Sequence, residues 1–132
     1  MGVRIIIDST ANVRKDYADK FTVVPLTVNF GTESFADGVE IDNDTFYKKL
    51  TTSDVMPTTS QPTPDAFEQA FKEVTEAGDE AVVITISSKL SGTYQSAMMA
   101  AADYHGKVFV VDSLSAAVGE RILLRRGLEL AE

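Results

Sequence analysis

Four short runs rich in β-branched residues, separated by stretches with helical periodicity, constrain the fold of this chain most. Such runs predict buried strands, and the stretches between them are long enough to hold helices. Strand–helix–strand order predicts an α/β fold, namely a three-layer domain whose parallel sheet is covered by helices on both faces. The predicted strands are residues 3–7, 22–30, 81–86 and 108–112.

Capping residues and apolar spacing mark the predicted helices. Thr63 and Pro64 are typical of a helix start and Gly78 of a helix end, with apolar residues at helical spacing between them. Asp42 is expected to cap a short helix that ends near Leu50. A third helix is expected to pack through an apolar stripe made of Leu90, Tyr94, Ala97, Met98 and Ala101, and a fourth to cover residues 114–130.

The second predicted strand carries an irregularity. Pro25 has no N–H to donate to a ladder, which indicates an edge strand or an irregular entry. Asp37 and Gly38 form a turn signal, so we expect residues 33–41 to make a small hairpin with the preceding strand.

Composition narrows the classes of function. A chain of 132 residues predicts one domain with a working core. Its 12 Lys and Arg against 20 Asp and Glu give a net charge of −8, which argues against nucleic acid or an anionic lipid surface as partner. The sequence has no cysteine for disulfides or thiolate metal sites, and no apolar run that predicts a membrane span. We therefore expect a cytoplasmic protein.

Two hydroxyl-rich loops, each leading into a predicted helix, are the strongest functional signal. They are residues 57–64 (PTTSQPTP) and residues 86–94 (ISSKLSGTY). Helix N-termini offer free backbone N–H groups and the positive end of the helix dipole. Hydroxyl donors at such ends predict a binding site for a carboxylate or a phosphate that needs no metal.

Other catalytic and metal-binding patterns are missing from the sequence. His105 is the single histidine and lies at a helix-ending turn, so a serine nucleophile has no base. Asp37, Asp42 and Asp44 are spaced too loosely for a calcium loop. We expect no catalytic residue, no metal and no cofactor. Three arginines of the last predicted helix are interpreted as solvated charge: Arg121, Arg125 and Arg126.

Four motifs in this order resemble the DegV family, the bacterial fatty-acid-binding proteins. They are a strand ending in Asp8-Ser9-Thr10, the sequence Thr59-Ser60-Gln61-Pro62 before a helix, a strand entering residues 87–97 (SSKLSGTYQSA), and a strand ending in Val111-Asp112-Ser113. The resemblance covers essentially the whole chain, and the four motifs together are far more specific than any one alone.

The resemblance implies a lipid-binding function. A long-chain fatty acid would lie in a tunnel, with its carboxylate presented to a separate fatty acid kinase subunit, so the chain would be a carrier and not an enzyme. By their positions in the motifs, Thr59 and Ser91 are the expected carboxylate ligands. The expected supporting positions of the site loops are Asp8, Ser9, Ser60 and Gly92.

The family resemblance also implies a second domain. Residues 1–132 correspond to the N-terminal domain, and we expect the second domain, which would close the tunnel, to be absent from this chain. A lone domain would bury only part of an acyl chain. We therefore expect weak binding, and either self-association or pairing with a separate second-domain chain.

Alternatives remain open at the level of residues and of function. Helix capping is the expected role of Ser60, Thr63, Ser87 and Ser88, and a strand-end cap is a competing role for Asp8. The chain could instead be a small α/β binder or enzyme acting on a phosphorylated metabolite, or a truncated domain without ligand. Because Lys89 is the only basic residue in the two loops, the fatty-acid carrier is favoured over a phosphate binder.

Overall fold

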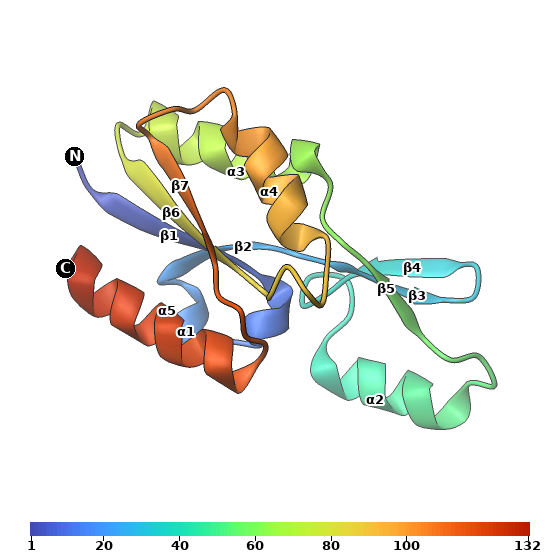
Figure 1. Cartoon of the computed structure of the whole chain (residues 1–132). Coiled ribbons are helices and arrows are strands. Elements are labelled where there is room, and N and C mark those ends of the chain that lie inside the picture. Colours follow the sequence, from blue (N-terminus) through green and yellow to red (C-terminus); the bar gives the residue numbers. More distant parts are fainter.

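Four parallel strands form the central sheet of the computed structural model, which describes residues 1–132 (Figure 1). In spatial order the strands are β2 (Phe21–Val24), β1 (Val3–Asp8), β6 (Glu80–Thr85) and β7 (Val108–Asp112). Every neighbouring pair is parallel; Ile5, for example, lies between Phe21 and Val82. The predicted parallel sheet is confirmed.

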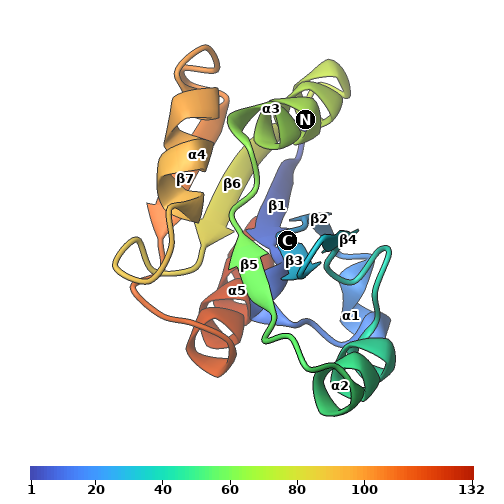
Figure 2. The same ribbon diagram turned by 90° about the vertical axis from the view of Figure 1, so that its right-hand side faces the viewer.

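Helices cover both faces of this sheet, as Figure 2 shows. One face is covered by α3 (Pro64–Glu76) and α4 (Thr93–Ala101), and the other by α1 (Lys15–Ala18) and α5 (Val118–Ala131). The remaining helix, α2 (Asn43–Thr52), packs through Phe46 on Phe30, away from this sheet. Side chains alternate along a strand, so Ile6 packs with Phe67 of α3 while Ile7 packs with Leu124 of α5. The three-layer α/β architecture is confirmed. None of the helices is both long and apolar enough to cross a membrane.

A second, smaller sheet lies beside the first and corrects the prediction of one strand over residues 22–30. It is antiparallel, in the order β4 (Glu33–Ala36), β3 (Thr27–Phe30), β5 (Thr58–Ser60). The run divides at Pro25, which cannot donate to the ladder, and at Leu26, whose N–H instead donates to the Ser9 hydroxyl. β3 therefore leaves the parallel sheet. The expected hairpin of residues 33–41 with the preceding strand is confirmed over Glu33–Ala36, where β4 ends.

The predicted helix starts are confirmed for α2 and α3. The Asp42 carboxylate accepts a hydrogen bond from the Thr45 N–H at 2.7 Å, and the Thr63 hydroxyl accepts one from the Ala66 N–H at 3.2 Å. Each cap satisfies an amide that has no partner within the helix.

The predictions for the last two helices need correction. Leu90, expected on the buried stripe of the third helix, lies in the turn before α4 and is 68% exposed. Met98, expected in the core, is 43% exposed, because the buried face of α4 is made of small residues such as Ala97. α5 begins at Val118 rather than at Leu114. Leu114 and Ala117 have φ values of 53° and 48°, which interrupt a right-handed helix.

Candidate functional site

The two hydroxyl-rich loops contact each other through the side chain of Gln61, which follows β5. Its Nε2 donates to the Ser96 hydroxyl in α4 at 3.0 Å. A Cβ placed on Gly92 would lie 1.9 Å from Oε1 of Gln61. Glycine at this position therefore lets the amide of Gln61 lie over the start of α4, while the supporting role of Gly92 in ligand binding stays a prediction.

β5 carries Thr59 and Ser60 at the edge of the small sheet. Thr59 is paired with Val28 of β3 and its side chain is exposed. The Ser60 hydroxyl accepts a hydrogen bond from Nδ2 of Asn29 at 3.0 Å. Ser60 thus makes a cross-strand bond and not the helix cap expected for it, while Thr59 is an exposed residue of the same strand.

Ser91 lies just before α4 and is half-buried. Its hydroxyl oxygen accepts the Thr93 N–H at 3.2 Å and lies 2.9 Å from the Thr93 hydroxyl. The hydroxyl therefore sits at the amino end of α4, where free N–H groups favour an anion. Whether Ser91 and Thr59 contact one carboxylate together stays a prediction.

Asp8 and Ser9 hold the end of β1 in place. Asp8 is fully buried and accepts hydrogen bonds from the N–H and hydroxyl of Thr10 and from the Ile86 N–H, the last at 2.6 Å. The Ser9 hydroxyl accepts the Leu26 N–H at 3.0 Å. Asp8 thus ties β1 to the residue that opens the loop of Ser91. The buried Asp8 carboxylate faces no solvent, and the supporting role of Asp8 and Ser9 in ligand binding stays a prediction.

A buried glutamate, Glu120 of α5, completes this cluster and was missed by sequence reasoning. It is fully buried, and its Oε2 lies 3.0 Å from the Thr10 hydroxyl, whereas its Oε1 has no partner. Burial, and then the negative charge of Asp8, raise the pKa of Glu120 to about 8; burial also raises the pKa of Asp8. Nothing local in the sequence marks Glu120 as buried, since Thr10 lies 110 residues away.

The hydrogen bonds in this cluster require one added proton. The Thr10 hydroxyl carries one hydrogen, so it cannot donate to both Asp8 and Glu120. Both contacts are satisfied when one of the two carboxyl groups is protonated and donates to Thr10, which in turn donates to the other. The raised pKa of both carboxyl groups favours this singly protonated pair, which carries one net negative charge.

A third loop, after β7, borders the Ser91 loop. The Asp112 carboxylate accepts the Ser88 N–H at 3.1 Å and the Leu114 N–H at 3.0 Å. The Ser88 hydroxyl, and then these two N–H groups, lower the pKa of Asp112 by hydrogen bonding to its carboxylate. The Ser87 N–H donates to the Ser115 carbonyl at 2.8 Å. The loops after β1, β6 and β7 thus gather at the carboxyl edge of the parallel sheet, where ligands bind in folds of this class.

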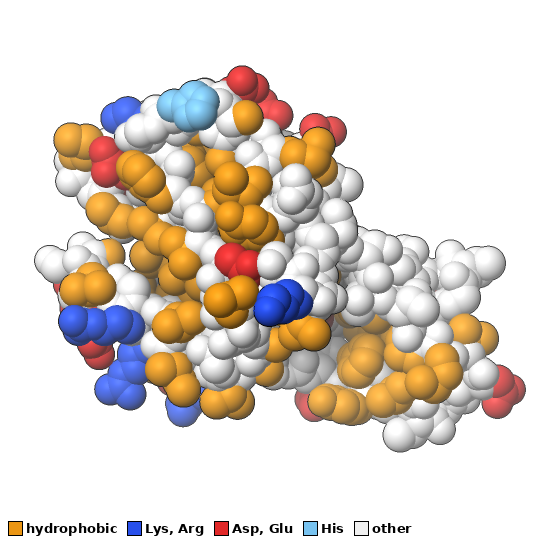
Figure 3. Space-filling model, viewed as in Figure 1, with side chains coloured by type: hydrophobic (Ala, Val, Ile, Leu, Met, Phe, Trp, Pro, Cys, Tyr) orange, Lys and Arg blue, Asp and Glu red, His pale blue; other side chains and the backbone are white.

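Exposed apolar side chains surround these loops. Leu90, Leu114 and Val118 are 68%, 67% and 59% exposed, and Phe109 and Val111 of the edge strand β7 are also exposed. Figure 3 shows hydrophobic side chains gathered over β7 and the loops near its end. The carboxyl edge of the sheet therefore combines hydroxyl donors with apolar surface.

Acidic groups elsewhere offer no comparable site. A cavity of about 240 Å³ beside the end of β1 is bordered by the acidic residues Asp37 and Asp42, whose negative charge disfavours an anion. No group of three or more His, Asp or Glu side chains is arranged to hold a metal ion.

Comparison with known proteins identifies relatives over nearly the whole chain. A family model described as "Uncharacterised protein, DegV family COG1307" matches residues 2–132. A DegV domain-containing protein of Clostridium perfringens is 37% identical, with 98% of this chain and 48% of that protein covered. The chain spans about half the length of the curated relatives that it matches.

Solved structures show the same fold. A DegV family protein from Thermus thermophilus, whose structure is described as showing fatty acid binding, has a TM-score of 0.89 at 36% identity. The match covers 98% of this chain and 47% of the Thermus protein. A DegV lipid binding protein from Thermotoga maritima has a TM-score of 0.88 at 34% identity, covering 98% and 48%. From its sequence and its fold, the chain belongs to the DegV family.

Proposed function

We propose that this chain binds a long-chain fatty acid and holds its carboxylate between Thr59 and Ser91, at the amino end of α4. The observation that carries the proposal is the contact of Gln61 with Ser96 and Gly92, because it holds the Thr59 strand against the start of α4. The structural relatives from Thermus thermophilus and Bacillus subtilis are described as binding fatty acid, which supports the choice of ligand.

The chemistry of the loop suits a carboxylate. When the Thr93 hydroxyl donates to Ser91, the Ser91 hydrogen is free to be donated to a ligand oxygen. The helix dipole adds a partial positive charge. A phosphorylated metabolite is less suitable, since Lys89 is the one basic side chain in the loop and Asp112 places a negative charge beside it.

The acyl chain would use the apolar surface next to the loops, where Leu90 and Leu114 are exposed. Burial contributes about 0.8 kcal/mol per CH₂, so half-covering a palmitate chain contributes roughly 6 kcal/mol, which association costs of about 4–15 kcal/mol largely offset. We therefore expect weak binding by this half-length chain alone. We propose that it acts as a carrier and not as an enzyme, that a fatty acid kinase subunit receives the ligand, and that a second domain or a second copy covers the apolar surface.

Native mass spectrometry of the purified chain, followed by lipid extraction, tests the ligand. We expect the added mass of a long-chain fatty acid, and a reduced bound fraction in Ser91→Ala. A bound phosphorylated metabolite, or a chain that takes up no fatty acid when palmitate is supplied at millimolar concentration, would contradict the proposal.

A further inference from the structure

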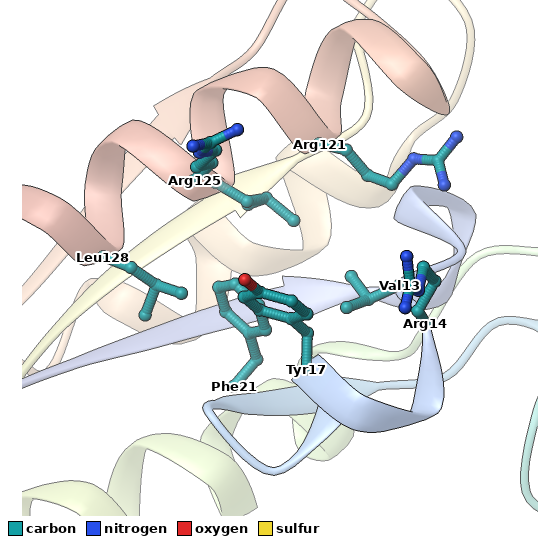
Figure 4. Close-up of a pocket in the computed structure, with 8 residues that line it drawn as sticks. Val13, Arg14, Tyr17, Phe21, Arg121, Arg125 and Leu128 are labelled. Carbon is teal, nitrogen blue, oxygen red and sulfur yellow. The ribbon is translucent and has the colours of Figure 1, made fainter.

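A cavity of about 410 Å³ lies between α1, β2 and α5, on the face of the parallel sheet opposite α3 and α4 (Figure 4). Its base is apolar and includes Phe21, Leu124 and Leu128. The volume falls within the range of about 300–1,000 Å³ found for small-molecule sites. None of the loops of the proposed carboxylate site lines this cavity.

Three of the five arginines of the chain line the same cavity. Arg14 is paired with Asp16 at 2.7 Å, and Arg125 lies 3.6 Å from Glu129, whereas Arg121 makes no ion pair. The chain has a net charge of −8, so a cavity lined by three guanidinium groups differs in charge from the rest of the surface.

Two of the arginines, Arg14 and Arg121, lie at one end of the cavity, whereas Arg125 lies toward the end where Leu128 is found. Figure 4 shows Arg14 and Arg121 near each other beside Val13, while Phe21 and Leu128 lie toward the other end. A ligand that fits this arrangement has an anionic head and an apolar body. Guanidinium groups favour such heads because their N–H groups match two oxygens of a carboxylate, sulfonate or phosphate.

We propose that this cavity binds a small anionic amphiphile, with its head between Arg14 and Arg121 and its apolar body against Phe21 and Leu128. The cavity is a second site, separate in place and chemistry from the hydroxyl site of Thr59 and Ser91. A polyanion is a poor occupant, since the acidic remainder of the surface repels it.

The fluorescent probe 1-anilinonaphthalene-8-sulfonate tests this proposal, because it has a sulfonate head and an apolar body. Removing a charged donor in Arg121→Gln should raise the Kd of the probe about tenfold. Arg126→Gln is the matched control, since Arg126 lies on the same helix and pairs with Glu129 but does not line the cavity. N-phenyl-1-naphthylamine, which lacks the sulfonate, should be insensitive to either substitution.

Three results would overturn the proposal. The first is equal probe affinity for Arg121→Gln and Arg126→Gln. The second is loss of probe binding in Ser91→Ala, which would place the probe at the hydroxyl site. The third is a protein that binds phosphatidylglycerol vesicles through Arg121 but does not bind the probe in solution. That result would assign the cavity to a membrane surface and not to a free molecule. Binding of the probe that survives Ser91→Ala would support the second site even if no fatty acid binds.

Discussion

The shared proton between Asp8 and Glu120 makes stability depend on pH in a direction opposite to that of an ordinary carboxylate. The pKa of Glu120 is about 8 in the folded chain against 4.5 for an unperturbed glutamate. Between those values the unfolded chain has lost the proton while the folded chain retains it, so a rise in pH favours unfolding. The stabilisation is complete below pH 4.5 and is lost as the pH rises through about 8.

The magnitude follows from the pKa difference. At about 1.36 kcal/mol for each pH unit, the upper bound is about 5 kcal/mol. Because Asp8 shares the proton and relaxation lets water reach the cluster, we expect a loss of about 2–4 kcal/mol in the free energy of unfolding between pH 5 and pH 9. Asp42 and Asp112 do not change stability between pH 5 and pH 9. Their pKa values are lowered from 3.8 in the folded chain, so the stability that they contribute is already fully present at pH 5.

Urea unfolding followed by circular dichroism at pH 5, 7 and 9 measures this loss. Glu120→Gln is the matched variant, since its amide remains neutral and can donate to the Thr10 hydroxyl. We expect it to be about 1–2 kcal/mol less stable than the parent at pH 5, because one amide hydrogen is left without a partner. At pH 9 it should be the more stable of the two. Parallel pH profiles for the two proteins, or a parent that gains stability from pH 5 to pH 9, would refute the shared proton.

Three further predictions concern the site, the core and the assembly. Gly92→Ala should displace the Gln61 amide and break its bond to Ser96, so palmitate affinity should fall several-fold while circular dichroism stays unchanged; unchanged affinity would contradict a role for this contact. Phe71→Ala should cost about 3–5 kcal/mol in urea unfolding, since the ring is fully buried between α3 and the sheet; a cost below about 1 kcal/mol would show that the core is packed otherwise. Sedimentation should show species heavier than the 14.3 kDa monomer, and a strict monomer that binds palmitate at nanomolar affinity would show that one domain encloses the ligand.

Local signals in the sequence predicted the parallel sheet and the helix starts. The β-branched runs of β1 and β6 are buried and pair on both sides, whereas β7, expected to be buried, is an edge strand. Thr63 with Pro64 caps α3 through residues next to them in the sequence. Each of these features depends on residues within one turn or one strand, so the sequence alone was sufficient.

The small antiparallel sheet and the buried glutamate depend on contacts between distant residues. β3 joins a different sheet because Val28 pairs with Thr59, 31 residues later. Glu120 is buried because α5 packs its first turn on the end of β1, at Thr10. The late start of α5 is set by the backbone of Ala117, for which alanine gives no signal.

The candidate site was predicted in part. The sequence marked both hydroxyl-rich loops, but not the way in which they meet. The loops meet because the Gln61 side chain occupies the space next to Gly92 that the Cβ of any other residue would fill. The local roles of Asp8 and Ser60 likewise became visible only with their partners Ile86 and Asn29 in place.

The affinity for palmitate of two matched pairs of variants tests the central claim most directly. Thr59→Ala is compared with Thr58→Ala, because neighbouring residues of β5 point to opposite faces of the strand. Ser91→Ala is compared with Thr63→Ala, since each variant loses one hydroxyl that accepts a helix N–H, at a cost of about 1 kcal/mol in stability.

Isothermal titration of the four variants and the parent should separate them into two groups. We expect Thr59→Ala and Ser91→Ala to bind palmitate about tenfold to a hundredfold more weakly, as loss of a charge-assisted hydrogen bond predicts, while Thr58→Ala and Thr63→Ala match the parent. Equal affinity in all five proteins, or equal weakening in both members of a pair, would contradict the assignment of Thr59 and Ser91 as carboxylate ligands.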